Sequence, residues 1–397
     1  MKRNMEKKIL NNTARLAVLA AFFINGAVMA TWVSRIPAIK ERLDLSEGEL
    51  GIVLLGMSIG VLASLSLAGG LIARFGSSKI TLIGALVMCA ALPLLAMMPN
   101  AFLLWAALAL FGGMMSMMDI SMNEQAVLVE RMAGKPLMSS FHAAYSVGGL
   151  AGALIGSGMA SISGVSTLLH FIIIMLFFGA AVVVAYRFLL PSVPVAPQEK
   201  QPVFSLPERA LWGLGAIAFC SAISEGAISD WSAVYLTQVM HSNASMAALG
   251  FAAFSMTMTM GRLFGDALIK KWSPSAIVRL GGLAAGLGLL VIVLAKQPGI
   301  ALVGFALAGI GLANVIPMVF SAAGNFPGIS AGAGIAGVAT IGYAGFLAGP
   351  PIIGMIAENT SLRIALILVT VLAISLVFSG KAIPQDNKML TSEGALD

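Results

Sequence analysis

Charged residues are scarce in this chain, at 10% of its 397 residues, whereas hydrophobic residues make up 59%. Soluble globular proteins have about 45 to 50% apolar residues, so this composition argues against a soluble domain and predicts a protein embedded in a lipid bilayer. Alternating blocks of about ten residues, typical of outer-membrane strands, are also missing, which disfavours a β-barrel. We therefore expect the chain to cross the membrane as α-helices.

Cysteine and the motifs of several enzyme classes are scarce or missing as well. The two cysteines, Cys89 and Cys220, form neither a disulfide framework nor a metal motif and are expected to be small buried side chains. A Gly-x-x-x-x-Gly-Lys-Ser/Thr loop is missing, which disfavours ATP-driven pumping by this chain. A membrane-embedded enzyme would need clustered metal or phosphate ligands, and none are found. We therefore expect no cofactor, no metal and no enzymatic activity.

Long apolar runs are what the sequence has instead. A helix needs roughly 20 apolar residues to cross the ~30 Å hydrocarbon layer. Twelve runs predict transmembrane helices, over residues 14–36, 46–72, 79–98, 101–128, 138–161, 166–190, 209–238, 245–269, 276–295, 299–322, 332–357 and 361–380. The first run is long and lacks a clear cleavage site, so we interpret it as an uncleaved span and not as a signal peptide.

The runs fall into two halves that echo each other. Asn25-Gly26-Ala27 recurs as Glu225-Gly226-Ala227, and Trp32 recurs as Trp231. The prediction is an all-α membrane protein with twelve transmembrane helices in two pseudo-symmetric six-helix bundles, over residues 1–190 and 209–397. Residues 191–208, rich in proline and polar side chains, are interpreted as a cytoplasmic linker. A duplicated bundle of this kind usually builds one binding site at the seam between its halves.

Basic residues indicate the orientation. If the N-terminus is cytoplasmic, eighteen Lys and Arg residues, including Arg262, lie on the cytoplasmic side and five on the other. By the positive-inside rule, we expect a multi-pass protein of the cytoplasmic (inner) membrane with both termini in the cytoplasm. The net charge of +6 reflects this orientation, so no nucleic-acid partner is expected.

The turn after the second run carries a recognisable pattern. It reads Gly69-Gly70-Leu71-Ile72-Ala73-Arg74-Phe75-Gly76-Ser77-Ser78-Lys79. This resembles the cytoplasmic signature loop of the major facilitator superfamily, with Ala73 in place of the usual Asp. A degenerate second copy follows the eighth run, with Lys271 at the position of Arg74. Phe141-His142 and Glu225-Gly226-Ala227 with Asp230-Trp231 also resemble a poorly characterised bacterial inner-membrane branch with some likeness to sugar permeases such as fucose permease.

The resemblance implies a secondary transporter that works by alternating access on a small-molecule substrate. Protons are the expected coupling ion, and the internal pseudo-symmetry favours a functional monomer in the lipid bilayer. In this family the signature loop latches the cytoplasmic side through its Asp. Because Ala73 replaces that residue, the latch must be altered or carried by another acid, for which Asp119 and Glu130 are candidates.

Glu225 is the strongest candidate for binding substrate or protons, because an ionisable group within hydrocarbon is costly and by default functional. Ser229 lies four residues on, on the same helix face. A structural hydrogen-bond network is the alternative interpretation. The resemblance places Asn25 opposite Glu225 across a central cavity, with Met29 and Trp32 continuing the face of Asn25. Trp32 would stack on a ring or belong to the interfacial aromatic belt.

Further candidates lie on other spans. Asp119 and Asn123 in the fourth span would bind substrate, or form a solvated gate nearer the cytoplasm. His142 would pair with Asp119 and relay protons, or sit at the interface. Asn314 completes the expected binding cavity, with Tyr343 as a weaker addition.

Gating is expected to involve charged residues at both ends of the bundle. Arg35 and Asp230 lie near the outer ends of spans one and seven, and we predict that they pair when the site faces inward. Snorkelling of Arg35 to the headgroups is the alternative. Arg74, in the signature turn, and His142 are the gating candidates on the cytoplasmic side.

Two kinds of transport fit these residues. Proton-coupled movement of a small polar or sugar-like solute is the first hypothesis. The 24 methionines favour the alternative, a proton-driven exporter of lipophilic, drug-like compounds with an adaptable apolar lining. A membrane-embedded enzyme is a distant third.

Overall fold

The structure, a computed structural model, describes residues 2–134, 137–191, 208–265, 268, 271–329 and 331–383. Within this part of the chain all regular structure is helical. The first half contains α1 (Lys2–Val33), α2 (Ile36–Arg42), α3 (Glu47–Phe75), α4 (Ser77–Met97), α5 (Ala101–Ala133), α6 (Met138–Ser161) and α7 (Thr167–Tyr186). The second half contains η1 (Arg209–Leu211), α8 (Trp212–Gln238), α9 (Ala244–Leu263), α11 (Pro274–Leu294), α12 (Pro298–Leu312), α13 (Val315–Gly324), α14 (Ala331–Asn359), α15 (Leu362–Ser379) and η2 (Gly380–Ala382).

Twelve spans in the described residues are long and apolar enough to cross a membrane, which confirms the prediction of the fold class. Two spans are interrupted in ways that the apolar runs did not predict. The first continues past a break at Ser34 and Arg35 into α2, and the tenth breaks at Ala313 and Asn314 between α12 and α13. Residues 192–207, most of the predicted linker, lie outside the described residues.

Short polar side chains begin many of the helices. An oxygen of the capping residue accepts a hydrogen bond from a backbone N–H in the first turn, which would otherwise lack a partner. Such caps are found at Ser46, Asn100, Ser166, Asn243, Ser273 and Ser361. The turn between α3 and α4 depends instead on Gly76, whose φ of 84° lies in the region that favours glycine.

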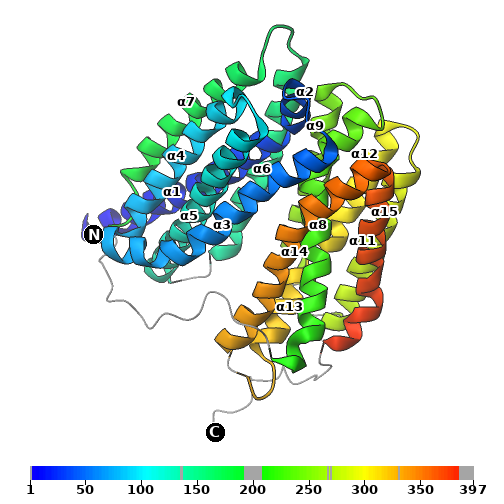
Figure 1. The fold of residues 1–397 in the computed structure, drawn as a ribbon. Coiled ribbons are helices and arrows are strands. Elements are labelled where there is room, and N and C mark those ends of the chain that lie inside the picture. The colour runs from blue at the N-terminus through cyan, green and yellow to red at the C-terminus, as the bar shows by residue number, and fades with distance from the viewer. Residues whose placement is uncertain are drawn as a thin grey trace.

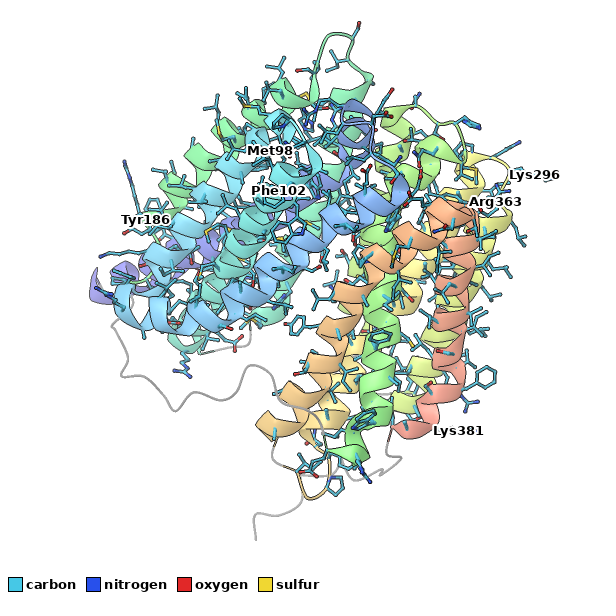
Figure 2. The ribbon with its side chains drawn as sticks, viewed as in Figure 1. Met98, Phe102, Tyr186, Lys296, Arg363 and Lys381 are labelled. Atoms are coloured by element: carbon cyan, nitrogen blue, oxygen red, sulfur yellow. The ribbon has the colours of Figure 1, made fainter. Side chains whose placement is uncertain are left out.

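The helices form two bundles that meet at one end and diverge toward the other (Figure 1). We call α1–α7 the N-bundle and α8–α15 the C-bundle. The main contacts between them join α3 to α14 and α6 to α9, with smaller contributions of α1 and α2 against α8. The end at which α2 meets the C-bundle is called the closed end, and the opposite end the open end. Lys296 and Arg363 lie at the closed end of the C-bundle and Lys381 at its open end (Figure 2).

Small residues allow close helix packing within each bundle. A side chain at Gly152 of α6 would overlap the backbone carbonyl of Ala27 in α1, and one at Gly148 would overlap that of Phe23. In lipid, helices gain little from hydrophobic association, so such close backbone contact supplies much of the packing energy. Gly158, on the same helix, has open space around it.

The packing predicts different outcomes for two matched substitutions. Gly152→Val should destabilise the N-bundle by about 1–3 kcal/mol, because the added side chain forces α1 and α6 apart. Gly158→Val should leave stability nearly unchanged, since nothing lies within reach of its side chain. Thermal unfolding of the purified protein in detergent measures the difference, and equal melting temperatures for the two variants would contradict this packing.

Candidate functional site

A cavity of about 300 Å³ lies at the seam between the two bundles. The N-bundle lines it with Met29, Leu54, Met57, Ser58, Val61, Leu62, Met115, Tyr145 and Ser146, and the C-bundle with Glu225, Gly226, Ser229, Asp230, Phe251, Phe254, Ser255, Met258, Arg262, Tyr343, Phe346 and Leu347. Its size and its mainly apolar wall with a few polar groups are typical of small-molecule sites. All three charged side chains of this lining belong to the C-bundle.

Glu225 and Arg262 form an ion pair inside this cavity. Arg262 Nη2 lies 3.8 Å from Glu225 Oε1, and both side chains are partly exposed to the cavity. Arg262 Nε also donates to the carbonyl of Ala313 at the break between α12 and α13. The predicted position of Glu225 in the cavity is thus correct, and its partner is a basic residue assigned to the cytoplasmic surface by the charge count. Ser255, Met258 and Arg262 follow helical spacing, a signal that would have placed Arg262 on the cavity face of α9.

Asp230 and Ser229 lie further along α8 toward the closed end, and both line the cavity. Asp230 has no hydrogen-bond or ion-pair partner among the described residues. Met29 and Tyr343 also line the cavity, as expected from the sequence.

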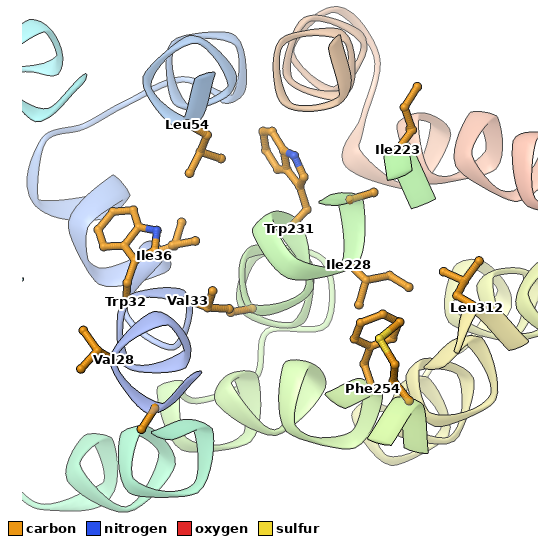
Figure 3. Packing of buried hydrophobic residues seen from close by; sticks show 14 of the residues in the cluster. Val28, Trp32, Val33, Ile36, Leu54, Ile223, Ile228, Trp231, Phe254 and Leu312 are labelled. Carbon is orange, nitrogen blue, oxygen red and sulfur yellow. The ribbon is translucent and has the colours of Figure 1, made fainter. Parts of the chain in front are cut away.

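Asn25 and Trp32 do not line the cavity, which corrects their expected positions. Asn25 is 1% exposed, and its Nδ2 donates to the carbonyl of Met115 in α5 at 3.1 Å. It therefore joins two helices of the N-bundle and does not face Glu225. Trp32 is also 1% exposed and lies among buried apolar residues of α1, so it belongs neither to a ring-stacking wall nor to an interfacial belt in this structure (Figure 3).

Asn314 is also turned away from the cavity. It lies at the start of α13, and its Nδ2 donates to the carbonyl of Gly261 in α9 at 2.9 Å. With the Arg262–Ala313 contact, this bond anchors the break in the tenth span to α9. Asn314 thereby supports the helix that carries Arg262, a different position from the one the sequence suggested.

Asp119 and Asn123 lie beyond the cavity lining on the open side. Asp119 is exposed and comes one helical turn after Met115, which lines the cavity. Asn123 Nδ2 donates to Asp119 O at 2.9 Å and to Asp119 Oδ1 at 3.3 Å. The expected pair between His142 and Asp119 is not formed among the described residues; His142 instead contacts Phe22 edge-on, with ring centroids 5.2 Å apart. This position fits the interpretation of Asp119 as a solvated acid near the opening.

The predicted pair between Arg35 and Asp230 is wrong for this structure. Arg35 Nε donates to His170 Nδ1 of α7 at 3.1 Å, and both side chains are buried within the N-bundle. The break between α1 and α2 turns Arg35 toward α7, whereas Asp230 faces the cavity. Arg74 lies on the exposed end of α3, with its guanidinium 5.1 Å from the ring centroid of Phe75.

A different set of polar residues joins the bundles at the closed end. Lys40 Nζ of α2 lies 3.2 Å from Glu47 Oε1 at the start of α3. The amide of Gln238, at the end of α8, accepts from Lys40 Nζ at 2.8 Å and donates to Glu47 Oε1 at 3.2 Å in its favoured orientation. We call these three residues the closed-end cluster. The apolar-run analysis could not find it, because each member lies outside or at the very end of an apolar run.

Two further contacts close this end. Ser157 Oγ of α6 and Ser245 Oγ of α9 are 2.8 Å apart. At the crossing of α3 and α14, a side chain at Gly51 would overlap the carbonyl of Pro350, so the two helices touch backbone to backbone. Below this layer, Leu54 and Phe254 belong both to the cavity lining and to the apolar core that includes Trp231 (Figure 3). The cavity is therefore sealed toward the closed end by packed side chains.

Metal binding finds no support in the described part of the chain, where no group of three or more His, Cys, Asp or Glu side chains could hold an ion.

Comparison with known proteins agrees with this architecture. Residues 17–343 match the sequence profile of the Major Facilitator Superfamily. An uncharacterised MFS-type transporter of Yersinia pestis is 35% identical over 368 residues, covering 91% of this chain and 94% of the relative.

Solved transporters share the fold at low identity. The crystal structure of the nucleoside transporter NupG has a TM-score of 0.77 at 12% identity, covering 93% of this chain and 99% of that one. The fucose:proton symporter FucP of E. coli has a TM-score of 0.60 at 14% identity, covering 94% and 98%. The twelve spans, the paired bundles and the match over most of the sequence lead to one conclusion: this chain is a membrane transport protein of the major facilitator superfamily.

Proposed function

We propose that the protein is a proton-coupled secondary transporter that moves a small solute across the cytoplasmic membrane by alternating access, as a monomer. The observation that carries the proposal is the Glu225–Arg262 pair in a cavity between two bundles that are packed together at one end only. The open end faces the cytoplasm in this proposal, because most Lys and Arg residues are assigned to that side. The structure then corresponds to the inward-open state.

Alternating access requires the bundles to separate at the closed end and to meet at the open end. The contacts to be broken are few and weak: the closed-end cluster, the Ser157–Ser245 hydrogen bond, and the backbone contact of α3 with α14. An exposed ion pair contributes about 0–1 kcal/mol, so a substrate with modest differential affinity for the two states can shift the balance. Rocking of one rigid bundle against the other around a fixed midplane site is how duplicated transporters generally work.

Proton coupling is assigned to Glu225. A carboxylate can gain and lose a proton, whereas its partner Arg262 remains charged. When Glu225 is protonated, the 3.8 Å ion pair is lost and the guanidinium becomes available to other groups in the cavity. Protonation therefore changes both the charge and the hydrogen bonding at the centre of the binding site, which is the requirement for coupling.

A second candidate is export of lipophilic compounds driven by protons. The apolar wall favours it, because methionine and phenylalanine side chains from both bundles, among them Met57, Met115, Met258 and Phe346, line the cavity. Flexible methionines adapt to ligands of different shape. The polar solutes named for NupG and FucP keep the first candidate, a small polar substrate, under consideration.

Substitution of the cavity carboxylate tests the coupling. Glu225→Gln should abolish solute accumulation driven by a pH gradient while exchange of solute across the membrane persists, because the amide cannot take up a proton. Proteoliposomes containing the purified protein, a panel of polar and lipophilic solutes and an internal pH dye provide the measurement. Glu208→Gln, an exposed carboxylate before η1, is the matched control and should behave as the native chain. Unchanged coupling in Glu225→Gln would refute the assignment.

Cross-linking at the closed end tests the motion. Ser157→Cys and Ser245→Cys, in a chain whose Cys89 and Cys220 are replaced by alanine, should form a disulfide, since the native hydroxyls are in contact. Oxidation should then arrest transport and reduction should restore it. Full transport by the oxidised protein would show that this end does not need to open.

Weakening the closed-end cluster should favour opening. Glu47→Gln leaves the largely buried Lys40 without its carboxylate partner and should shift the equilibrium by about 1 kcal/mol, or roughly fivefold. The rate at which a bulky thiol reagent labels a single cysteine at position 157 reports the change. Glu41→Gln, an exposed neighbour on α2, should label at the unaltered rate. Equal rates in both variants would mean that the cluster does not hold the closed end.

A further inference from the structure

The charges that line the cavity do not balance. Glu225 and Arg262 offset each other as an ion pair, and Arg262 is further engaged with the carbonyl of Ala313. Asp230 is the third charged residue of the lining and has no hydrogen-bond or ion-pair partner in the part of the chain that the structure describes. The cavity therefore carries one uncompensated negative charge when both acids are ionised.

Asp230 lies at the deep side of the cavity. It is five residues beyond Glu225 on α8, which corresponds to roughly 7.5 Å along the helix toward the closed end. There the wall is apolar: Leu54 and Phe254 belong both to the lining and to the packed core above it. A carboxylate held next to such a wall, with little water and no protein partner, favours a cation as its neighbour.

The surrounding side chains suit a cation with an apolar body. Phe251, Phe254 and Phe346 present aromatic rings, which attract cations through their faces, and methionines supply an adaptable surface. An anionic substrate is disfavoured, because Arg262 already has a carboxylate partner and Asp230 would repel the anion. A sugar is disfavoured because Trp32 and Trp231, which could stack on its ring, are buried outside the lining.

We propose that the transported solute is an organic cation with an apolar body, and that Asp230 binds its positively charged nitrogen at the deep side of the cavity. This inference rests on the proposed transport function and specifies the substrate class of the same site. Met29 and Leu54 of the N-bundle lie across the seam from Asp230 in this lining, so the bound cation contacts both bundles. A ligand held by both bundles is what couples occupancy to their relative motion.

Three small aromatic probes of matched shape separate charge from size. They are 1-methylquinolinium, a permanent cation; quinoline, which is neutral near pH 7; and quinoline-2-carboxylate, an anion. Isothermal titration calorimetry on the purified full chain in detergent gives their affinities. The cation should bind roughly tenfold or more tightly than either of the others, because a charge pair in a partly dehydrated site contributes at least that factor. Equal affinities, preference for another probe, or no binding of any probe would overturn the proposal.

Variants of Asp230 locate the effect. Asp230→Asn should remove the preference for the cation, whereas Asp230→Glu should retain it and Glu208→Gln should match the native chain. Persistence of the preference in Asp230→Asn would overturn the assignment of the residue. If that variant does not fold, the native chain and Asp230→Glu still test the substrate class, since their preference among the probes requires no loss of charge.

Failure of this inference is distinguishable from failure of the proposed function. A native chain that shows no cation preference but moves a neutral solute with its proton gradient would refute the substrate class alone. A chain that still transports after the Ser157–Ser245 positions are cross-linked would refute the proposed motion, whatever the calorimetry shows.

Discussion

A charge inside the hydrocarbon layer must find a partner or water, and this constraint organises the interior of the protein. Helices satisfy their own backbone groups, so side chains carry the remaining polar problem. Three basic side chains within the spans show three solutions: Arg262 pairs with Glu225 in the cavity, Arg35 donates to the buried His170, and Lys40 is held by Glu47 and Gln238. Each solution ties together helices that are distant in sequence. The polar residues therefore determine which helices are joined, and the apolar residues determine how closely.

The two kinds of contact have different consequences for motion. Within a bundle, backbones touch along their length at glycine and alanine positions, as where Gly148 and Gly152 of α6 meet α1. Between bundles, the contacts described here lie toward the closed end and include exposed polar side chains that water can replace. Each bundle is thus held as a unit, while their association costs little to break at any one place. This contrast in packing is the physical basis for treating the bundles as two rigid bodies.

Properties that depend on local sequence were predictable, and those that depend on side-chain direction were not. Hydropathy predicted the spans, and repeats predicted two bundles with a site between them, because both follow from the bilayer and from duplication. Asn25 and Met29 show the limit: they lie four residues apart on one helix, yet Asn25 turns to α5 and Met29 to the cavity.

Arg262 shows a second limit of the sequence. It lies near a helix end, where basic residues ordinarily reach the membrane surface, and only the break at Ala313 makes its inward position possible. That break cannot be read from hydropathy, because both of its flanking helices are apolar. Likewise, the closed-end cluster needs a turn after α2 and the end of α8 to meet in space, which no pattern along the chain specifies.

Duplication of a bundle gives a symmetric scaffold, and the charges show where the symmetry is broken. Glu225 stands where the first half has Asn25, and all three charged residues of the cavity lining lie on the C-bundle. The N-bundle contributes methionines, aliphatic side chains, two serines and Tyr145. A ligand that bridges the seam therefore meets charge on one side and an adaptable apolar surface on the other. In such a site, protonation changes the affinity of one bundle only, and this inequality allows a proton gradient to drive a symmetric scaffold in one direction.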